Sequence, residues 1–178
     1  MKPLISFILF TFFSFSLHAQ CAWEKNNKYP FNGTISRSTP WETITRTFFS
    51  SISFQIVEYQ QDSSMHLNVK VDVNLRHIPK RCFDDKSKIM LKSGDTLINI
   101  NFLGHAECGD ILIDYGKLLS EDIKFLQQNY IDMVRIYFDE GYDDYKVRDP
   151  LSIIPNSKFN KSKDFKSDYF IRTLQCFE

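Results

Sequence analysis

The most regular feature of this chain is the strict alternation of apolar and polar residues from Met65 to Leu75. Such alternation places every second side chain on the same face of a β-strand. The segment from Phe48 to Tyr59 behaves similarly, with Ile52, Phe54 and Ile56 on one side. Both segments therefore predict strands of an antiparallel sheet that has one packed face and one face in water.

Shorter alternating segments predict two β-hairpins and two further strands. The first hairpin spans Ile89 to Phe102 and turns at Ser93-Gly94-Asp95, and the second spans Asp132 to Arg148 and turns at Glu140-Gly141. Thr34 to Ser36 and Ile111 to Tyr115 are short strands. The first strand of the second hairpin has two faces. Its core face is expected to carry Val134, Ile136 and Phe138, and its outer face carries Met133, Arg135 and Tyr137.

Two helices complete the predicted secondary structure. A short helix begins at Ser120, a residue type that caps helix N-termini, and ends near Asn129. A second helix is predicted from Lys163 to Cys176, because aromatic and aliphatic residues recur there with helical spacing. The expected fold class is α+β, mainly β: an antiparallel curved sheet or a sandwich of hairpins, with one short internal helix and a C-terminal helix.

The first nineteen residues carry a different pattern from the rest. Lys2 precedes an apolar, Phe-rich stretch that runs from Leu4 to Leu17, and the small residue Ala19 follows. This pattern predicts a secretory signal peptide over residues 1–19, too short to span a membrane, which needs about 20 apolar residues. Residues 20–178 would then form a single exported domain, periplasmic or extracellular. The alternative is lipoprotein processing at Cys21, although Gln20 is not the small residue that this reaction needs.

The charge balance restricts the class of partner. The chain has 22 basic and 22 acidic residues, and loss of the leader would remove one lysine and no acid. A near-neutral domain lacks the basic footprint of nucleic-acid-binding proteins. After residue 19 no apolar run reaches the length of a transmembrane segment. We therefore expect another protein or a cell-envelope component as the partner, with no nucleic acid.

All four cysteines lie beyond the leader, which favours disulfides in an oxidising compartment. Cys82 and Cys108 lie twelve and fourteen residues on either side of Gly94, the expected tip of the first hairpin. Residues nearly equidistant from such a tip become neighbours on antiparallel strands, so we expect these two to pair. Cys21 would then bond to Cys176. The alternative is that Cys21 is lost or lipidated and that Cys176 is a buried thiol.

The sequence contains no complete catalytic or metal-binding motif. His105-Ala106-Glu107 matches half of a zinc deaminase signature, but the P-C-x-x-C half is missing. His66, His77 and His105 do not have zinc-ligand spacing, and the acidic turn lacks the EF-hand pattern. The residues of that turn are Asp139, Glu140, Asp143 and Asp144. We expect no cofactor; the enzyme alternative is a hydrolase or metal-dependent enzyme that uses His105 and Glu107, with Asp110 nearby.

One set of residues predicts an interaction surface. Met133, Arg135 and Tyr137 point away from the expected core, and Tyr142 lies next to the hairpin turn. Tyrosine, methionine and arginine are enriched in protein interfaces. The alternative is that a second sheet or the C-terminal helix covers this face. The function that we expect is that of a non-catalytic binding module, of an inhibitor or immunity type.

The chain resembles a group of small exported proteins from Bacteroidota-type bacteria. The likeness lies in Phe31-Asn32-Gly33-Thr34, the hairpin from Ile89 to Phe102, Cys108-Gly109, and Leu119-Ser120-Glu121-Asp122-Ile123 leading to Ile136-Tyr137 and Gly141-Tyr142. The resemblance covers most of the chain after the leader and implies export and a β-rich fold. It implies no activity.

Overall fold

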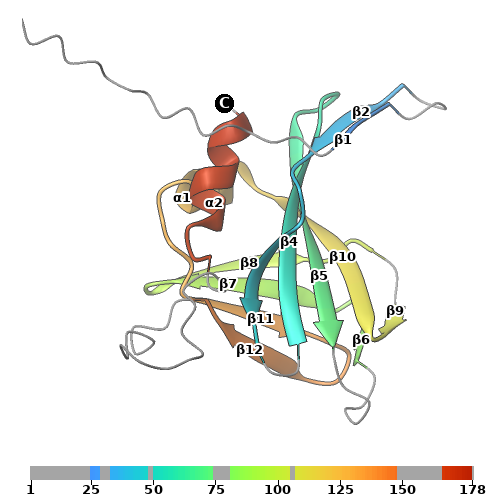
Figure 1. Ribbon diagram of the computed structural model, residues 1–178, viewed down its shortest axis with the longest axis vertical. Coiled ribbons are helices and arrows are strands. Elements are labelled where there is room, and N and C mark those ends of the chain that lie inside the picture. Colours follow the sequence, from blue (N-terminus) through green and yellow to red (C-terminus); the bar gives the residue numbers. More distant parts are fainter. Residues whose placement is uncertain are drawn as a thin grey trace, which may run out of the picture.

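The computed structural model describes residues 33–47, 50–73, 81–104, 108–147 and 166–177, and the backbone alone of 25–28 and 107. Within these ranges the chain forms two antiparallel sheets, a two-stranded ribbon and two short helices. The strands of the first sheet run from top to bottom in Figure 1, and those of the second run across them behind. The predicted α+β, mainly β fold is therefore confirmed.

The first sheet has the order β1-β2-β4-β5-β10, with β3 also paired to β4. Its strands are β1 (Lys25–Lys28), β2 (Ile35–Ser38), β3 (Glu42–Arg46), β4 (Ser50–Tyr59), β5 (Ser64–Val73) and β10 (Ile111–Leu118). The alternation predicted for the Met65 segment is confirmed, because Leu67, Val69 and Val71 are fully buried. Residues 74–80, where that strand was expected to end, lie outside the described ranges.

The prediction that β4 has one face in water is wrong, because every residue from 52 to 58 is buried. The polar side chains on the second face bond to one another and to the segment before β3. The Gln55 amide donates to the Thr39 carbonyl (2.8 Å), and the Asn68 amide donates to Gln55 Oε1 (3.0 Å). Alternation alone does not separate a solvated polar face from one whose polar groups are paired.

The second sheet has the order β12-β11-β7-β8. Its strands are β7 (Lys88–Ser93), β8 (Thr96–Asn101), β11 (Met133–Tyr137) and β12 (Tyr142–Lys146). Both predicted hairpins are present, and their turns use Gly94 and Gly141 at φ +57° and +85°, angles that favour glycine. Val134, Ile136 and Phe138 are buried, as expected for the core face.

A small ribbon carries the predicted disulfide. Strands β6 (Arg81–Phe83) and β9 (Glu107–Gly109) pair so that Cys82 lies directly opposite Cys108, and their sulfur atoms are bonded. This pairing was predicted, whereas the two strands themselves were not. Cys176 is also disulfide-bonded, so the alternative of a buried thiol is wrong; Cys21, its expected partner, lies outside the described residues.

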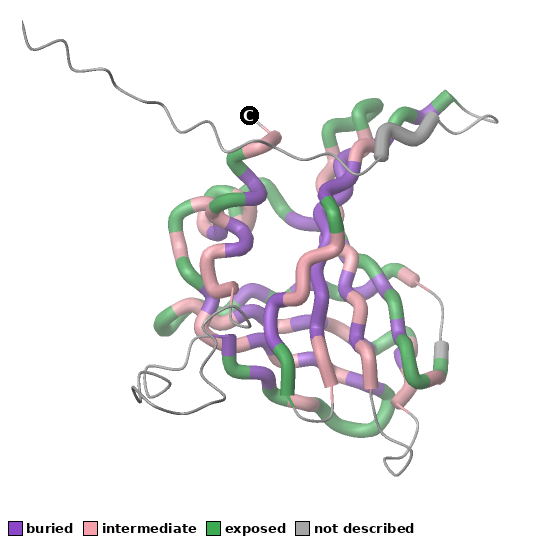
Figure 2. The backbone as a smooth tube through the Cα atoms, in the orientation of Figure 1, coloured by how far each residue is buried: buried purple, intermediate pink, exposed green. Residues whose placement is uncertain are grey.

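The two sheets meet along both of their sides. On one side the Leu103 amide donates to the Tyr115 carbonyl (2.8 Å), which connects the end of β8 to β10. On the other side the Thr45 hydroxyl of β3 donates to the Lys146 carbonyl of β12 (2.9 Å). One hydrophobic core fills the space between the sheets, and Figure 2 shows its buried residues alternating along the strands.

Helix α1 (Ser120–Leu126) begins one residue earlier than a Ser120 cap would allow. Leu119 occupies the N-cap position and makes no side-chain capping bond at the N-terminus of the helix. The reason is that β10 remains extended through the buried Leu118, so Leu119 is the last extended residue and its carbonyl accepts the Ile123 amide (2.9 Å). Asn129 ends the helical region as predicted, because its side-chain amide donates to the Phe125 carbonyl (2.8 Å).

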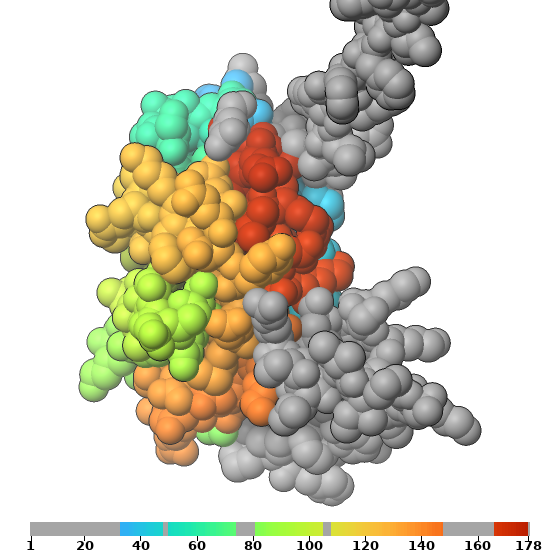
Figure 3. Space-filling view, turned by 90° about the vertical axis from the view of Figure 1, so that its left-hand side faces the viewer, coloured from blue at the N-terminus to red at the C-terminus, as the bar shows by residue number. Residues whose placement is uncertain are grey.

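Helix α2 (Tyr169–Leu174) continues into a 3₁₀ turn, η1 (Gln175–Phe177). It is shorter than the helix predicted from Lys163; residues 163–165 lie outside the described ranges. Its Tyr169 and Phe170 rings lie 5.8 and 5.7 Å from the Phe54 ring of β4, and α2 lies beside α1 (Figures 1 and 3). Neither described helix is long and apolar enough to cross a membrane.

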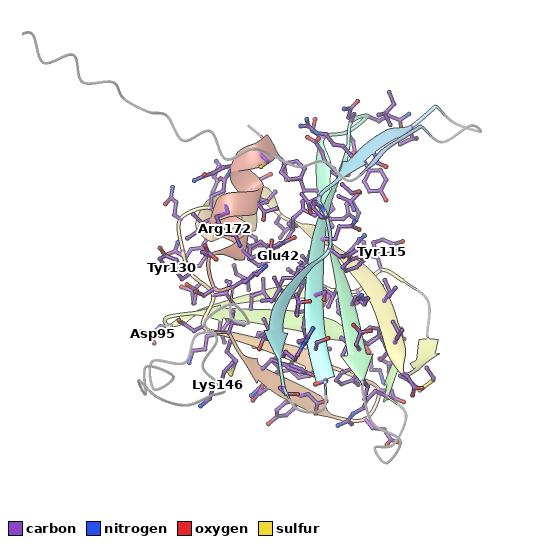
Figure 4. The ribbon with its side chains drawn as sticks, viewed as in Figure 1. Glu42, Asp95, Tyr115, Tyr130, Lys146 and Arg172 are labelled. Atoms are coloured by element: carbon purple, nitrogen blue, oxygen red, sulfur yellow. A yellow bond between two sulfur atoms is a disulfide. The ribbon has the colours of Figure 1, made fainter. Side chains whose placement is uncertain are left out.

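Ion pairs connect α2 and the segment before it to β3. Glu42 accepts from Lys166 (2.6 Å) and from Arg172 (2.9 Å). Figure 4 labels Glu42 on β3 and Arg172 on α2. Two backbone bonds complete the attachment: the Lys166 amide donates to the Ile44 carbonyl (3.1 Å), and the Ile131 amide donates to the Ser167 carbonyl (3.0 Å). The segment before α2 therefore bridges β3 and the loop before β11.

Candidate interaction surface

The outer face of the second sheet holds the predicted interaction residues in a regular array. Strand pairing places twelve outward side chains in three rows across β12, β11, β7 and β8. The rows are Lys146, Met133, Lys92 and Leu97; Asp144, Arg135, Met90 and Asn99; and Tyr142, Tyr137, Lys88 and Asn101. We refer to these twelve residues as the grid face. The sequence predicted Met133, Arg135, Tyr137 and Tyr142, but not the eight residues that the register adds to them.

The grid face is open to solvent. Each of its residues is exposed or half-buried, and the exposed fraction of Tyr142 is 51%. No described helix or strand packs on it. Helices α1 and α2 pack against the core between the two sheets, and the grid face is the opposite, outer face of the second sheet. Within the described ranges, the alternative that a second sheet or the C-terminal helix covers this face is therefore wrong.

Contacts between neighbouring strands order the side chains of the grid face. The Arg135 guanidinium lies 4.0 Å from the centre of the Tyr142 ring and forms two bonds with the Asp144 carboxylate, at 2.5 and 2.8 Å. The Lys88 ammonium lies 4.9 Å from the centre of the Tyr137 ring. The two tyrosine rings are 5.7 Å apart. Cation–π contacts and a two-bond arginine–carboxylate pair restrict the rotamers of both tyrosines and of Arg135.

This network perturbs the ionisation of Asp144. Hydrogen bonds from Arg135 lower the pKa of the Asp144 carboxyl, and the same contact raises the pKa of Arg135. We expect the Asp144 pKa to rise towards the ordinary aspartate value in an Arg135→Gln variant, followed by carboxyl carbon NMR between pH 2 and 6. Asp84 is the control, since its lowered pKa is due to a hydrogen bond from Ser87 and should not change.

The sign of the associated pH dependence follows from the lowered pKa. The contribution of the Asp144–Arg135 pair to stability is complete above the ordinary aspartate pKa and is lost as pH falls through the lowered value. The Asp144 side chain is 38% exposed, so solvent screens the pair and this contribution is small. An unchanged Asp144 titration in the Arg135 variant would contradict the assignment.

An arginine of the ribbon binds the acidic turn beside the grid face. Arg81 donates to the Glu140 carbonyl (2.9 Å) and to the Asp143 carboxylate (3.1 Å). The Asp139 carboxylate accepts the Glu140 amide (2.8 Å). Among the described residues no group of three or more His, Cys, Asp and Glu side chains could hold a metal ion. The contacts of this turn are therefore one ion pair, between Arg81 and Asp143, and hydrogen bonds to the Glu140 backbone.

The histidines considered for a metal site and the residues of the enzyme alternative are only partly described. His77, His105 and the side chain of Glu107 lie outside the described ranges, and Asp110 is exposed. His66 is described and half-buried. Its ring lies 5.1 Å from that of Tyr59 and 5.8 Å from that of Tyr115, and burial lowers its pKa. His66 therefore belongs to an aromatic contact on the first sheet.

Strand β10 presents a second apolar surface that the sequence reading missed. Ile111, Ile113 and Tyr115 point outward with exposed fractions of 55, 50 and 39%, and we refer to them as the β10 strip. The inward positions include Asp114, which is buried and accepts the amides of Gly104 (2.8 Å) and Tyr115 (2.7 Å). The sequence signal for this strip is the spacing of its three apolar residues at every second position. That spacing shows that they share one face of the strand, but it does not show whether this face points to the core or to solvent.

No protein family, curated protein or solved structure matches this chain. The grid face and the β10 strip are therefore the two features from which a function can be inferred. They differ in chemistry: the grid face combines cations, aromatic rings, amides and methionines, whereas the β10 strip is apolar.

Proposed function

We propose that this protein is an exported, non-catalytic binding module, of an inhibitor or immunity type, whose protein or envelope partner docks on the grid face. The observation that carries the proposal is the ordered group of Arg135, Tyr137 and Tyr142, held on an uncovered sheet by their mutual contacts. Tyrosine and arginine dominate the binding energy of protein interfaces. Side chains that are already ordered lose little further entropy when a partner binds.

The location that we propose rests on three observations. The Cys82–Cys108 disulfide is formed, and such bonds persist in oxidising compartments. The apolar leader over residues 1–19 and the resemblance to small exported Bacteroidota-type proteins imply the same compartment. The partner would accordingly be another exported protein or an envelope component.

Capture of a partner from the native envelope by the purified chain tests the proposal. We expect a Tyr142→Ala, Arg135→Ala variant to retain at most about one tenth of the partner that the unmodified chain binds, because interface anchors of this type contribute more than about 1.4 kcal/mol each. Tyr130→Ala is the matched control, since Tyr130 is also 51% exposed but lies in the loop before β11, away from the grid face (Figure 4).

Two outcomes would contradict the assignment of this surface. One is equal capture by the unmodified chain and the double variant when both have the same melting temperature. The other is loss of the partner in an Ile113→Ser variant but not in the double variant, which would move the docking site to the β10 strip.

A further inference from the structure

We infer that the partner of the grid face is an acidic protein whose carboxylates bind the lysines of this face, an inference that rests on the function proposed above. Four of the twelve residues of the grid face are cationic and one is acidic, although the whole chain has no formal net charge. The cations are Lys88, Lys92, Arg135 and Lys146, and the acid is Asp144. The positive charge is therefore concentrated on the surface that we assign to binding.

The ion pairs of the described residues leave the three lysines available. Arg135 takes the Asp144 carboxylate, and Lys88 lies over the Tyr137 ring. Within the described part of the chain, no carboxylate forms a salt bridge with Lys88, Lys92 or Lys146. The ammonium groups of these lysines can therefore bind the carboxylates of a partner.

The row that contains two lysines shows where a partner carboxylate would bind. Lys92 and Lys146 lie directly on either side of Met133, one on β7 and the other on β12. Strands in a sheet are about 4.8 Å apart, so the two lysine backbones are separated by roughly 10 Å. Two flexible ammonium groups at that separation can bind one carboxylate above the Met133 side chain, or two neighbouring carboxylates.

The other side chains of the grid face favour a protein over a nucleic acid. Tyr137 and Tyr142 already contact cations of this chain, so their ring faces are not free platforms for stacked bases. Met90, Met133 and Leu97 lie among the lysines and offer apolar contacts that a phosphate backbone does not use. A surface of carboxylates and apolar side chains complements this mixture, and a polyphosphate does not.

A random copolymer of glutamate and tyrosine tests this inference in fluorescence anisotropy titrations of the full exported chain with its disulfides intact. We expect a Lys92→Gln, Lys146→Gln variant to bind the copolymer at least about tenfold more weakly than the unmodified chain, and the difference to diminish at high salt. Lys117→Gln is the matched control: Lys117 is an exposed strand lysine on the outer face of the first sheet. Its variant should bind within about twofold of the unmodified chain.

Three outcomes would overturn the inference. They are no binding of the copolymer to the unmodified chain, equal binding by the double variant, and tighter binding of duplex DNA than of the copolymer through the same lysines. Equal melting temperatures, or a repeat with the single variants, exclude a loss of folding. If the partner captured from the envelope requires Tyr142 but binds the double lysine variant normally, the docking surface is correct and the acidic character of the partner is not.

Discussion

Replacing Gly116 with alanine is expected to lower the free energy of unfolding by about 3 kcal/mol, because β10 approaches the end of β8 too closely for a side chain. A Cβ at this position would lie 2.3 Å from Ile100 Cγ2 and 2.6 Å from the Asn101 carbonyl oxygen. The Ile100 side chain is buried and the carbonyl belongs to the backbone, so neither can move without disturbing the corner where the sheets meet. Urea unfolding measures the loss directly, and for a domain of this size the melting temperature should fall by roughly 6 to 12 °C.

Gly109→Ala is the control for this steric effect. A Cβ on Gly109, which pairs with Arg81 in the ribbon, would lie 3.6 Å from the Ile111 carbonyl oxygen, an ordinary contact. This substitution should change the stability by less than about 1 kcal/mol, and a small gain is possible because alanine restricts the unfolded chain. Equal losses of unfolding free energy in the two variants would contradict the steric explanation for Gly116.

Removal of the Cys82–Cys108 bond by double serine substitution should cost about 3.5 kcal/mol of unfolding free energy. The bond closes a loop of sequence separation 26, and the loss of loop entropy in the unfolded chain gives this magnitude. Cys108 is exposed and Cys82 half-buried, so little hydrophobic burial is lost and the effect is mainly one of the unfolded state. Urea unfolding of the oxidised chain and of the variant gives the difference.

The loss should appear mainly as a less stable ribbon. The second sheet keeps its own ladders, and the Asp139 amide still donates to the Cys82 carbonyl (3.1 Å) in the absence of the sulfur bond. Amide hydrogen exchange should therefore accelerate most at β6 and β9 and least at β7 and β11. A loss below about 1 kcal/mol, or uniform acceleration over all strands, would contradict this account.

Much of the fold could be predicted from the sequence because its signals were local. Glycine turns at Gly94 and Gly141 and the alternation from Leu67 to Val71 gave two hairpins and the central strand in the correct positions. The disulfide followed from counting residues around one of those turns. These inferences needed only the geometry of a strand and of a turn.

The parts that could not be predicted depend on contacts between distant segments. Nothing local to β10 indicates that Ile111 and Ile113 face solvent while Asp114 is buried, since hydrophobicity alone favours the opposite orientation. The Gly104 and Tyr115 amides that satisfy Asp114 fix the observed register. In the same way, the only grid-face residues that could be predicted were four residues of the second hairpin. The lysines and methionine of β7 joined the grid face only through strand pairing across 45 residues, from Met90 to Arg135.

The attachment of α2 to β3 determines when this chain can fold. The ion pair between Arg172 and Glu42 joins residues 130 positions apart, and the contacts of Phe54 with Tyr169 and Phe170 span nearly as much of the chain. Contacts of such long range make folding slow, because the entropy of closing the loop is lost before the contacts form. Until α2 has been synthesised, Phe54 of β4 lacks the Tyr169 and Phe170 rings that pack against it. We therefore expect the nascent protein to complete its fold only after synthesis has reached this helix.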